Sequence, residues 1–152
     1  VYIKVDKRQA QGHNIVRTKC VDTNKGDVEN PDYRSRLVAM EFNEGQDPSL
    51  FAATPPLEAM RYLVHRAATT CDGPSLSMMT VDVKRAYFGA KATRDVYISI
   101  PKEDQVPGDE DKVGKLRLCL YGTRDAAFNW SETVAAQLHE SGFVRGRAFP
   151  SV

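Results

Sequence analysis

The stretch Thr80-Val81-Asp82-Val83-Lys84-Arg85-Ala86-Tyr87-Phe88 decides what fold the chain is expected to adopt. The apolar run from Leu76 to Val81 predicts a buried strand, and the residues after Asp82 have the spacing of a helical turn. A carboxylate at the end of a buried strand is costly unless a cation, a metal ion or water meets it. The residues alone therefore leave two roles open for Asp82, a metal ligand or the N-cap of a short helix over Lys84–Phe88.

The composition is that of one globular domain. Hydrophobic residues make up 41% and charged residues 27% of the 152 residues, so a sizeable core can form. The formal net charge of +1 does not indicate nucleic-acid binding, and any basic surface would have to be local. No segment has the pattern of a membrane span or a signal peptide, so we expect an intracellular protein, cytoplasmic or nuclear. Because the chain starts at Val1 rather than methionine, we expect a piece of a longer protein.

Cysteine and histidine do not point to a metal centre. The three cysteines, Cys20, Cys71 and Cys119, are far apart and odd in number. This spacing supports neither a disulfide framework nor a zinc site. The three histidines likewise lack ligand or triad spacing.

The first part of the chain predicts a β-hairpin. Residues 1–14 are polar and mixed, and we expect them to form a poorly ordered lead-in. Ile15–Val21 and Tyr33–Phe42 both have the composition of strands, and turn-forming residues lie between them. The two-residue period of a strand places Arg34 and Arg36 on one face, which by default is a solvated face.

The remaining elements follow from periodicity and from turn residues. After the hairpin we predict, in order, a helix over Leu57–Thr69, a stop at Asp72-Gly73-Pro74, the buried strand, a strand over Val96–Ile100, a mobile acidic loop over Lys102–Gly114, a strand over Lys115–Tyr121 and a helix over Asp125–Glu140. Gly142 is expected to end the last helix as its C′ residue. Each helix has one apolar face that is expected to point inward, formed in the first by Leu57, Met60, Leu63, Val64, Ala67 and Ala68, and in the second by Ala127, Trp130, Val134, Ala135 and Leu138.

Five sequence blocks occur in a fixed order. They are R-x-R-L-V-A (34–39), T-P-P-L-E-A-x-R (54–61), V-D-V-K-x-A-Y (81–87), V-Y-I-x-I-P (96–101) and L-Y-G-x-R-x-A before a helix with Trp130 (120–130). In this order the blocks resemble the reverse transcriptase of Ty1/copia-type LTR retrotransposons. The resemblance covers roughly residues 15–149, and five ordered blocks are far more specific than any one of them.

The resemblance implies an α+β fold, part of a right-hand polymerase. A fingers β-hairpin would join an incomplete palm sheet with packed helices over residues 15–152, truncated before the Asp-Asp motif. The activity implied is RNA-directed DNA polymerisation, a nucleotidyl transfer with Mg²⁺ as cofactor. The implied partners are an RNA/DNA template-primer, dNTP and the rest of a Pol polyprotein that also serves DNA integration.

The resemblance also assigns roles to the metal and sugar positions. Asp82 corresponds to the first catalytic aspartate, which binds both metal ions, and the carbonyl of Val83 would face a metal as well. Mg²⁺ suits a site of few carboxylates completed by phosphate oxygens. Tyr87 corresponds to the aromatic ring beneath the incoming sugar, which excludes a 2′-hydroxyl by its size.

Two further positions would hold the incoming nucleotide. Arg34 or Arg36 would bind the triphosphate from the fingers, since a guanidinium makes bidentate phosphate contacts. The residues do not decide which of the two makes the contact. Tyr121 and Gly122 correspond to the start of motif B, where the backbone approaches nucleotide and template.

The chain also departs from the family pattern. Asp125-Ala126-Ala127 stands where the family usually has Gln-Ala-Pro, Phe88-Gly89-Ala90 stands in place of Leu-Asn-Gly, and Cys20 in place of tryptophan. The sequence contains no Asp-Asp pair. We therefore expect two-metal chemistry only in the full-length parent, and an inactive chain as given that exposes apolar surface and aggregates. The alternative is a non-catalytic nucleic-acid-binding module or a decayed retroelement remnant.

Overall fold

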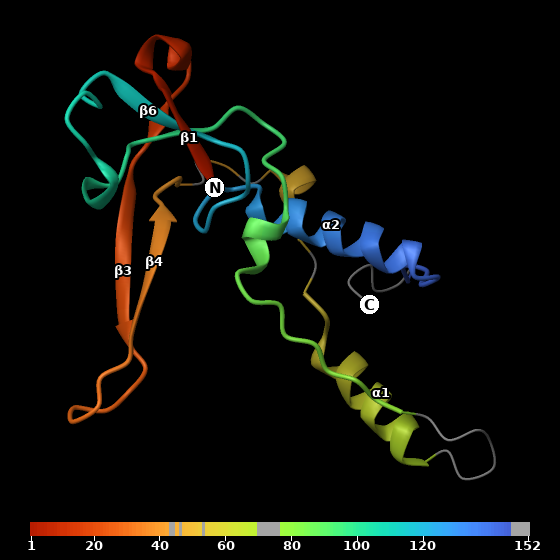
Figure 1. Ribbon diagram of the computed structural model, residues 1–152. Helices are drawn as coiled ribbons and strands as arrows, with labels where there is room; N and C mark the ends of the chain where they lie inside the picture. The colour runs from red at the N-terminus through yellow and green to blue at the C-terminus, as the bar shows by residue number, and fades with distance from the viewer. Residues whose placement is uncertain (43–44, 46, 53, 70–76, 147–152) are drawn as a thin grey trace.

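The protein combines two sheets with two α-helices. The computed structural model describes residues 1–42, 45, 47–52, 54–69 and 77–146 (Figure 1). One sheet has the strand order β1-β6-β5-β2 and the other pairs β3 with β4. The predicted α+β class is confirmed. The strands are β1 (Tyr2–Asp6), β2 (Ile15–Val16), β3 (Thr18–Asn24), β4 (Tyr33–Ala39), β5 (Tyr97–Ile98) and β6 (Lys112–Leu116), and the helices are α1 (Leu57–Thr69) and α2 (Ala126–Glu140).

The predicted hairpin is confirmed as β3 and β4, but its first strand runs over Thr18–Asn24 instead of Ile15–Val21, and its second ends at Ala39 instead of Phe42. The two strands pair antiparallel from Thr18 opposite Ala39 to Asn24 opposite Tyr33. The side-chain oxygen of Asn24 accepts hydrogen bonds from the backbone nitrogens of residues 26 and 32, which closes the connecting loop. The preceding strand β2 leaves the hairpin and pairs parallel with β5.

The prediction of a poorly ordered lead-in is wrong for residues 2–6. These residues form β1, which pairs along its whole length with β6, from Tyr2 opposite Leu116 to Asp6 opposite Lys112. The partner strand lies in the second half of the chain. The local composition of residues 1–14 therefore carried no sign of it.

The acidic segment before α2 is also more ordered than predicted. Strand β6 begins at Lys112, inside the expected mobile loop, and the predicted strand over Lys115–Tyr121 matches it only at residues 115–116. Gly114 permits this arrangement, because an added Cβ would lie 2.7 Å from Tyr2 Cδ2 and 2.8 Å from Ile98 Cγ1. The absence of a side chain there lets both neighbouring strands pack closely over β6.

Asp109 is the buried carboxylate of this segment. Its side chain is 3% exposed and accepts from Lys4 Nζ at 2.7 Å and from Lys112 Nζ at 3.0 Å. Because a buried carboxylate needs partners, these two lysines account for its position. The acidic segment thus contributes an ionic link between β1 and β6.

We expect the stability of the chain to fall in acid because of Asp109. The hydrogen bonds from Lys4 and Lys112 hold the pKa of this carboxyl well below its ordinary value of about 3.9. The resulting stability is complete above the unfolded-state pKa and is lost as the pH falls below it. Urea unfolding should find Asp109→Asn less stable than wild type at about pH 6, with the gap closing toward about pH 2. A gap that does not change with pH would contradict this role.

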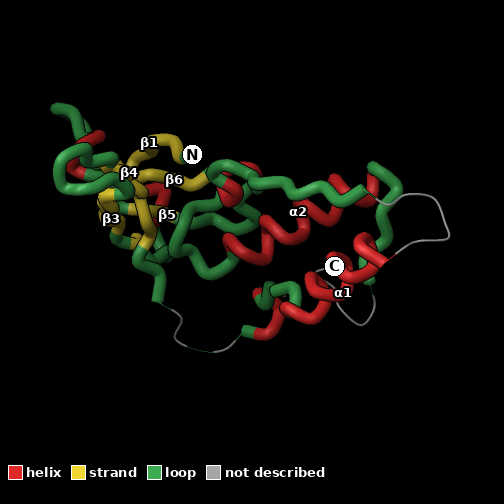
Figure 2. Tube along the Cα trace, turned by 90° about the horizontal axis from the view of Figure 1, so that it is seen from below, coloured by secondary structure: helices red, strands yellow, loops and turns green. Residues whose placement is uncertain are grey.

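The main core lies where the hairpin meets the sheet. Ile98 and Leu120 are completely buried, and Ala39, Val96 and Leu116 complete their cluster. Ala39 is the last residue of β4, so this cluster fixes the base of the hairpin. Strands gather on one side of the molecule and both helices on the other (Figure 2).

The predicted buried strand over Leu76–Val81 is wrong. Residues 77–83 form no strand and are exposed; Met79 is 83% and Val81 69% exposed. Apolar character predicted burial, but a strand also needs a partner for its backbone groups, and within the described residues none pairs with this segment. Leu76 and the predicted stop at Asp72-Gly73-Pro74 lie outside the described residues.

Helix α1 has the predicted bounds but not the predicted packing. It runs from Leu57 to Thr69 and has no buried residue. The apolar face expected to point inward is largely open to solvent, with Met60 62% exposed. Helical periodicity therefore predicted the element correctly and its burial wrongly.

Helix α2 is confirmed within one residue at its start. Gly142 follows it with φ +90°, donating to the His139 carbonyl at 2.9 Å, and Phe143 donates to the Leu138 carbonyl at 3.0 Å. This pair of bonds is a Schellman motif, as Gly142 predicted. The most buried positions of the helix are Ala126 and Asn129, one residue before the predicted inward positions 127 and 130. Among the described residues, none of the helices has the length and apolarity that crossing a membrane requires.

Candidate functional site

A large cavity with a charged lining lies between the hairpin and the stretch that follows residue 81. Its volume is about 1120 Å³. Its lining comes from the first strand, β4, residues 82–85 with Phe88, and the turn before α2. Arg34, Arg36, Asp82 and Val83 all line it, so the structure brings together four of the residues selected from the sequence. We call this space the cationic cavity.

Strand β4 aligns the two arginines. Arg34 pairs in register with Thr23 and Arg36 with Val21, so both side chains leave the same face of the hairpin. Arg34 Nε lies 3.7 Å from the carboxylate of Asp32, and both side chains are 61% exposed. Such an exposed ion pair is weak, which leaves the guanidinium available to an anion.

Asp82 and Val83 enter the cavity from an exposed, irregular segment. Arg85 follows in a left-handed conformation, with φ 56° and ψ 43°, and begins the short 3-10 helix Ala86–Gly89. A side chain with a Cβ is strained in this region by about 1–3 kcal/mol. The N-cap position belongs to Arg85, which makes no side-chain capping bond, so the N-cap alternative for Asp82 is wrong.

The charge in the cavity is mainly positive. Five cationic residues line it, against the two carboxylates of Asp82 and Asp104. Asp104 already accepts from the Tyr2 hydroxyl and lies 3.6 Å from Lys4 Nζ. The surplus of cations suits a polyanion such as a phosphate chain. The cations are Lys4, Arg34, Arg36, Lys84 and Arg85.

The residues present do not by themselves fit a divalent metal. Across the described part of the chain, no group of three or more His, Cys, Asp or Glu residues could hold a metal ion. Asp82 is one carboxylate among several cations, whereas two-metal sites share several carboxylates. A complete metal site would therefore need further carboxylates.

The ring of Tyr87 is separated from the cationic cavity by the ring of Tyr121. The Tyr87 ring contacts that of Tyr121, with centroids 4.8 Å apart and planes at 52°. Phe88 meets the same ring edge-on, at 5.7 Å and 73°. Tyr121 lines the cationic cavity, whereas Tyr87 does not. The three rings therefore form a wall between this cavity and a second one.

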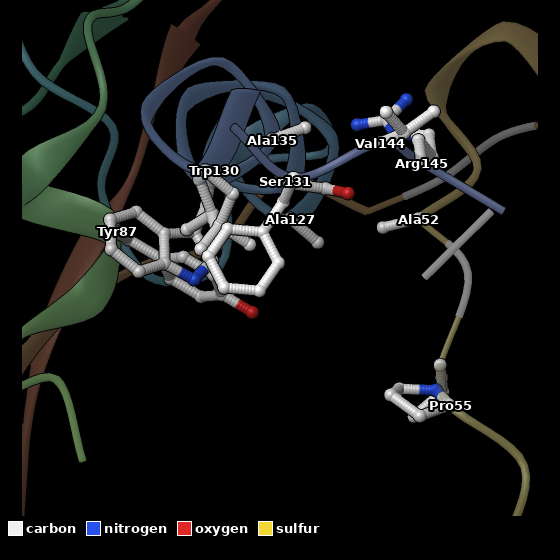
Figure 3. Close-up of a pocket in the computed structure, with 13 residues that line it drawn as sticks. Ala52, Pro55, Tyr87, Ala127, Trp130, Ser131, Ala135, Val144 and Arg145 are labelled. Carbon is white, nitrogen blue, oxygen red and sulfur yellow. The ribbon is translucent and has the colours of Figure 1, made fainter. Parts of the chain in front are cut away.

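The second cavity is smaller and apolar. Its volume is about 410 Å³, and its lining combines Ala127, Trp130 and Ala135 of α2 with Tyr87 and Pro55 (Figure 3). Most of the predicted inward face of α2 thus borders an open groove instead of filling a core. Periodicity identified this face but could not show that, among the described residues, it lines a cavity.

Gly122 joins the base of the hairpin to the turn before α2. It has φ +83°, and an added Cβ would collide with the carbonyl oxygen of Ala39 and lie 2.8 Å from Val38 Cγ1. Just before it, Tyr121 accepts from the Ala39 backbone nitrogen at 2.7 Å. The structure places Gly122 beside the hairpin backbone and outside the lining of the cationic cavity.

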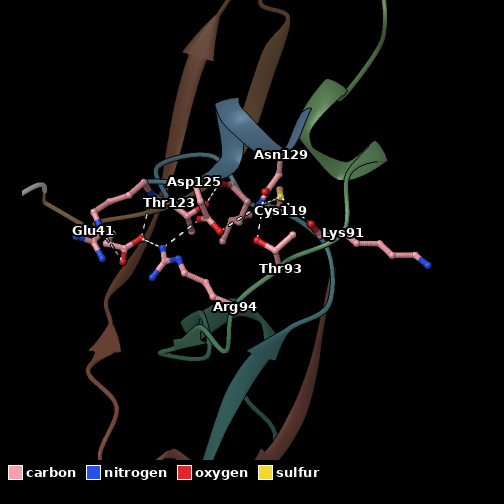
Figure 4. A network of polar contacts seen from close by, with 10 residues as sticks. Glu41, Lys91, Thr93, Arg94, Cys119, Thr123, Asp125 and Asn129 are labelled. Carbon is pink, nitrogen blue, oxygen red and sulfur yellow. Dashed lines mark hydrogen bonds and ion pairs between the residues drawn. The ribbon is translucent and has the colours of Figure 1, made fainter. Parts of the chain in front are cut away.

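A partly buried ionic network lies behind this junction, and sequence reasoning missed it. Arg94 Nη2 donates to Glu41 Oε2 at 2.5 Å and to Asp125 Oδ1 at 3.1 Å (Figure 4). The backbone nitrogen of Arg124 donates to the same oxygen of Glu41 at 2.9 Å. Asn129 donates to the other oxygen of Asp125 at 3.1 Å. We call these five residues the Arg94 network.

The network favours the charged forms of Arg94 and Glu41. Burial alone would lower the pKa of Arg94, but its bonds to Glu41 and Asp125 outweigh this effect and raise it. Burial alone would raise the pKa of Glu41, but Arg94 and the Arg124 backbone outweigh it and lower it. The one signal in the sequence was the acidic Asp125 in place of the family's glutamine.

Comparison with known proteins agrees with the sequence blocks. A family model described as "Reverse transcriptase (RNA-dependent DNA polymerase)" matches residues 2–150. The Nicotiana tabacum protein "Retrovirus-related Pol polyprotein from transposon TNT 1-94" is 28% identical over 108 residues. That alignment covers 69% of this chain and 8% of the relative, so the chain spans a small part of the curated relative's length. No solved structure matches.

The family match covers nearly every residue, both cavities and the Arg94 network included. The resemblance to a copia-type retrotransposon enzyme is thereby confirmed at the level of the family. The chain belongs to the reverse transcriptase (RNA-dependent DNA polymerase) family.

Proposed function

We propose that this chain forms the triphosphate-binding side of the polymerase site of a retrotransposon reverse transcriptase. The observation that carries this proposal is the shared cationic cavity of Arg34, Arg36 and Asp82. Guanidinium groups on one strand face can hold successive phosphates in bidentate contacts. The reaction in the parent is RNA-directed DNA synthesis, with an RNA/DNA template-primer and dNTP as substrates.

The subdomains follow from this role. Strands β3 and β4 are the fingers hairpin, and the four-stranded sheet with its helices belongs to an incomplete palm. The rings of Tyr87 and Tyr121 bound the sugar side of the nucleotide. Gly122 supports this wall from behind, since it keeps the backbone of Tyr121 against β4.

In the full-length parent, Mg²⁺ would stabilise the developing charge of nucleotidyl transfer, and Asp82 would offer it one carboxylate ligand and the Val83 carbonyl a second oxygen. The rest of the Pol polyprotein would have to supply the other carboxylates. The sequence has no Asp-Asp pair, and two-metal nucleotidyl transfer needs more than one carboxylate. The 152 residues alone therefore bind phosphate but do not polymerise DNA.

Binding of inorganic tripolyphosphate tests the proposal. Replacing Arg34 and Arg36 together by alanine should weaken binding at least about tenfold, since each charged contact contributes more than about 1 kcal/mol. The control is Lys19→Ala with Lys25→Ala, which removes two charges from the same hairpin outside the cavity. Isothermal titration calorimetry at fixed salt measures both. An equal loss in the control would contradict specific binding in the cavity.

A second pair of assays distinguishes the polymerase proposal from the alternative of a non-catalytic nucleic-acid-binding module. Steeply salt-dependent binding of an RNA–DNA hybrid, without turnover on adding Mg²⁺, is expected of the isolated chain under either reading. Joining the chain to a palm segment that carries an Asp-Asp pair, in trans or in one chain, should give primer extension only if the parent is a polymerase. Incorporation of dNTP by the 152 residues alone would show that the chain is complete enough for catalysis.

A further inference from the structure

We propose that Arg94 is a positioning residue that locks the arginine-bearing hairpin onto the turn before α2. It touches neither cavity, so it has no direct contact with a bound nucleotide. Its effect passes through Glu41 and Asp125, which hold it from opposite sides. The lock itself stands on geometry alone, whereas its consequence for phosphate binding rests on the proposed function.

The two carboxylates come from segments far apart in the sequence. Glu41 lies two residues beyond the end of β4, and Asp125 directly precedes α2. Their side chains are 13% and 4% exposed, and that of Arg94 is 33% exposed. Water therefore competes little for these contacts. Without the guanidinium of Arg94, Asp125 would lose this ion pair, and Glu41 would keep the one with Arg124, whose Nε lies 3.3 Å from Glu41 Oε1.

Backbone bonds carry the lock into β4. Ala39 donates to the Tyr121 carbonyl at 2.7 Å, and Glu41 donates to the Gly122 carbonyl at 3.4 Å. These two bonds connect the end of the hairpin to the turn before α2. The Arg94 network begins at Glu41, the second of the two donors. Arg36 lies three residues before Ala39 on the same strand. The orientation of the Arg36 side chain therefore depends on how the base of the hairpin is held against the turn.

The network also accounts for the departure at position 125. An aspartate here would be unfavourable near a polyanion if its charge were free. Arg94 neutralises it on one side, and Asn129 on the other side donates to its second oxygen and to Cys119 Sγ at 3.5 Å. Thr93 donates to the amide oxygen of Asn129 at 3.2 Å, which ties the residue beside Arg94 to α2. The aspartate at position 125 is thus one of the charged partners that the Arg94 network requires.

Amide hydrogen exchange tests the lock directly. In Arg94→Gln, the amides of Ala39 and Glu41 should exchange at least about tenfold faster than in wild type, because their acceptors on the turn move away. Arg94→Lys should restore most of the protection, since an ammonium can bridge the two carboxylates. A control for general loss of stability is Val113→Ala, which lies in a separate core cluster.

Tripolyphosphate binding tests the consequence. Arg94→Gln should bind several-fold more weakly at a temperature where both variants are folded, while Val113→Ala binds like wild type. Unchanged exchange at Ala39, or exchange and binding that follow the Val113→Ala pattern, would overturn the positioning role. If wild type binds no tripolyphosphate, the proposed function fails, yet the exchange experiment still decides whether Arg94 forms the lock.

Discussion

A Gly122→Ala variant is expected to lose about 3 kcal/mol or more of its free energy of unfolding. Two costs add at this position. The left-handed backbone, φ +83°, is unfavourable for any residue with a Cβ, by roughly 1–2 kcal/mol. The new methyl would also overlap the carbonyl oxygen of Ala39, which is backbone and cannot rotate away. Either β4 or the turn must shift, and the bond from Ala39 to Tyr121 is lost.

The matched control for this variant is Gly108→Ala. Gly108 has φ +93°, but an added Cβ there meets nothing within 4 Å, so only the conformational cost applies. Urea unfolding of both variants separates strain from collision. Equal losses of stability would contradict the close approach of the turn to the hairpin. A larger loss for Gly122→Ala, with fast exchange of the Ala39 amide, is the expected result.

Local signals predicted the elements that depend on local interactions. The bounds of α1, the Schellman end of α2 and the pairing of β3 with β4 follow from periodicity and turn residues within each segment. The pairing of Tyr2–Asp6 with β6 could not be predicted in this way. Its stability comes from a distant strand and from the space above Gly114, which no local pattern encodes.

The residues of the candidate site were likewise predicted from the sequence only in part. Arg34 and Arg36 share a face because of strand geometry alone, and the resemblance added Asp82, which lines the same cavity. Tyr87 and Gly122 lie outside the lining; Tyr87 contacts the ring of Tyr121, which lines the cavity, and Gly122 follows Tyr121 in sequence. Arg94 and Glu41 could not be found from the sequence, because an ion pair between distant charges has no local spacing.

The stretch after residue 76 was predicted to be a buried strand but is exposed, and this exposure affects how the chain behaves in solution. Apolar side chains predicted burial there, and the structure leaves them open to water alongside an equally open face of α1. Exposed apolar surface gains about 25 cal/mol for each Å² that association removes from water. The backbone of residues 77–83 also lacks strand partners within the described residues, which favours pairing between copies. We therefore expect the isolated chain to self-associate.

Val81→Lys is expected to lower this self-association strongly. A lysine in the centre of the exposed segment makes its contacts with another copy costly, since the ammonium would have to lose its water. The control is Val28→Lys, because Val28 is 97% exposed in the hairpin loop and gains the same charge. Light scattering at matched concentration should move Val81→Lys toward the monomer mass of 16.9 kDa, while Val28→Lys stays close to wild type. Equal effects would mean that net charge, and not this apolar segment, controls association, and a monomeric wild type would contradict the expectation altogether.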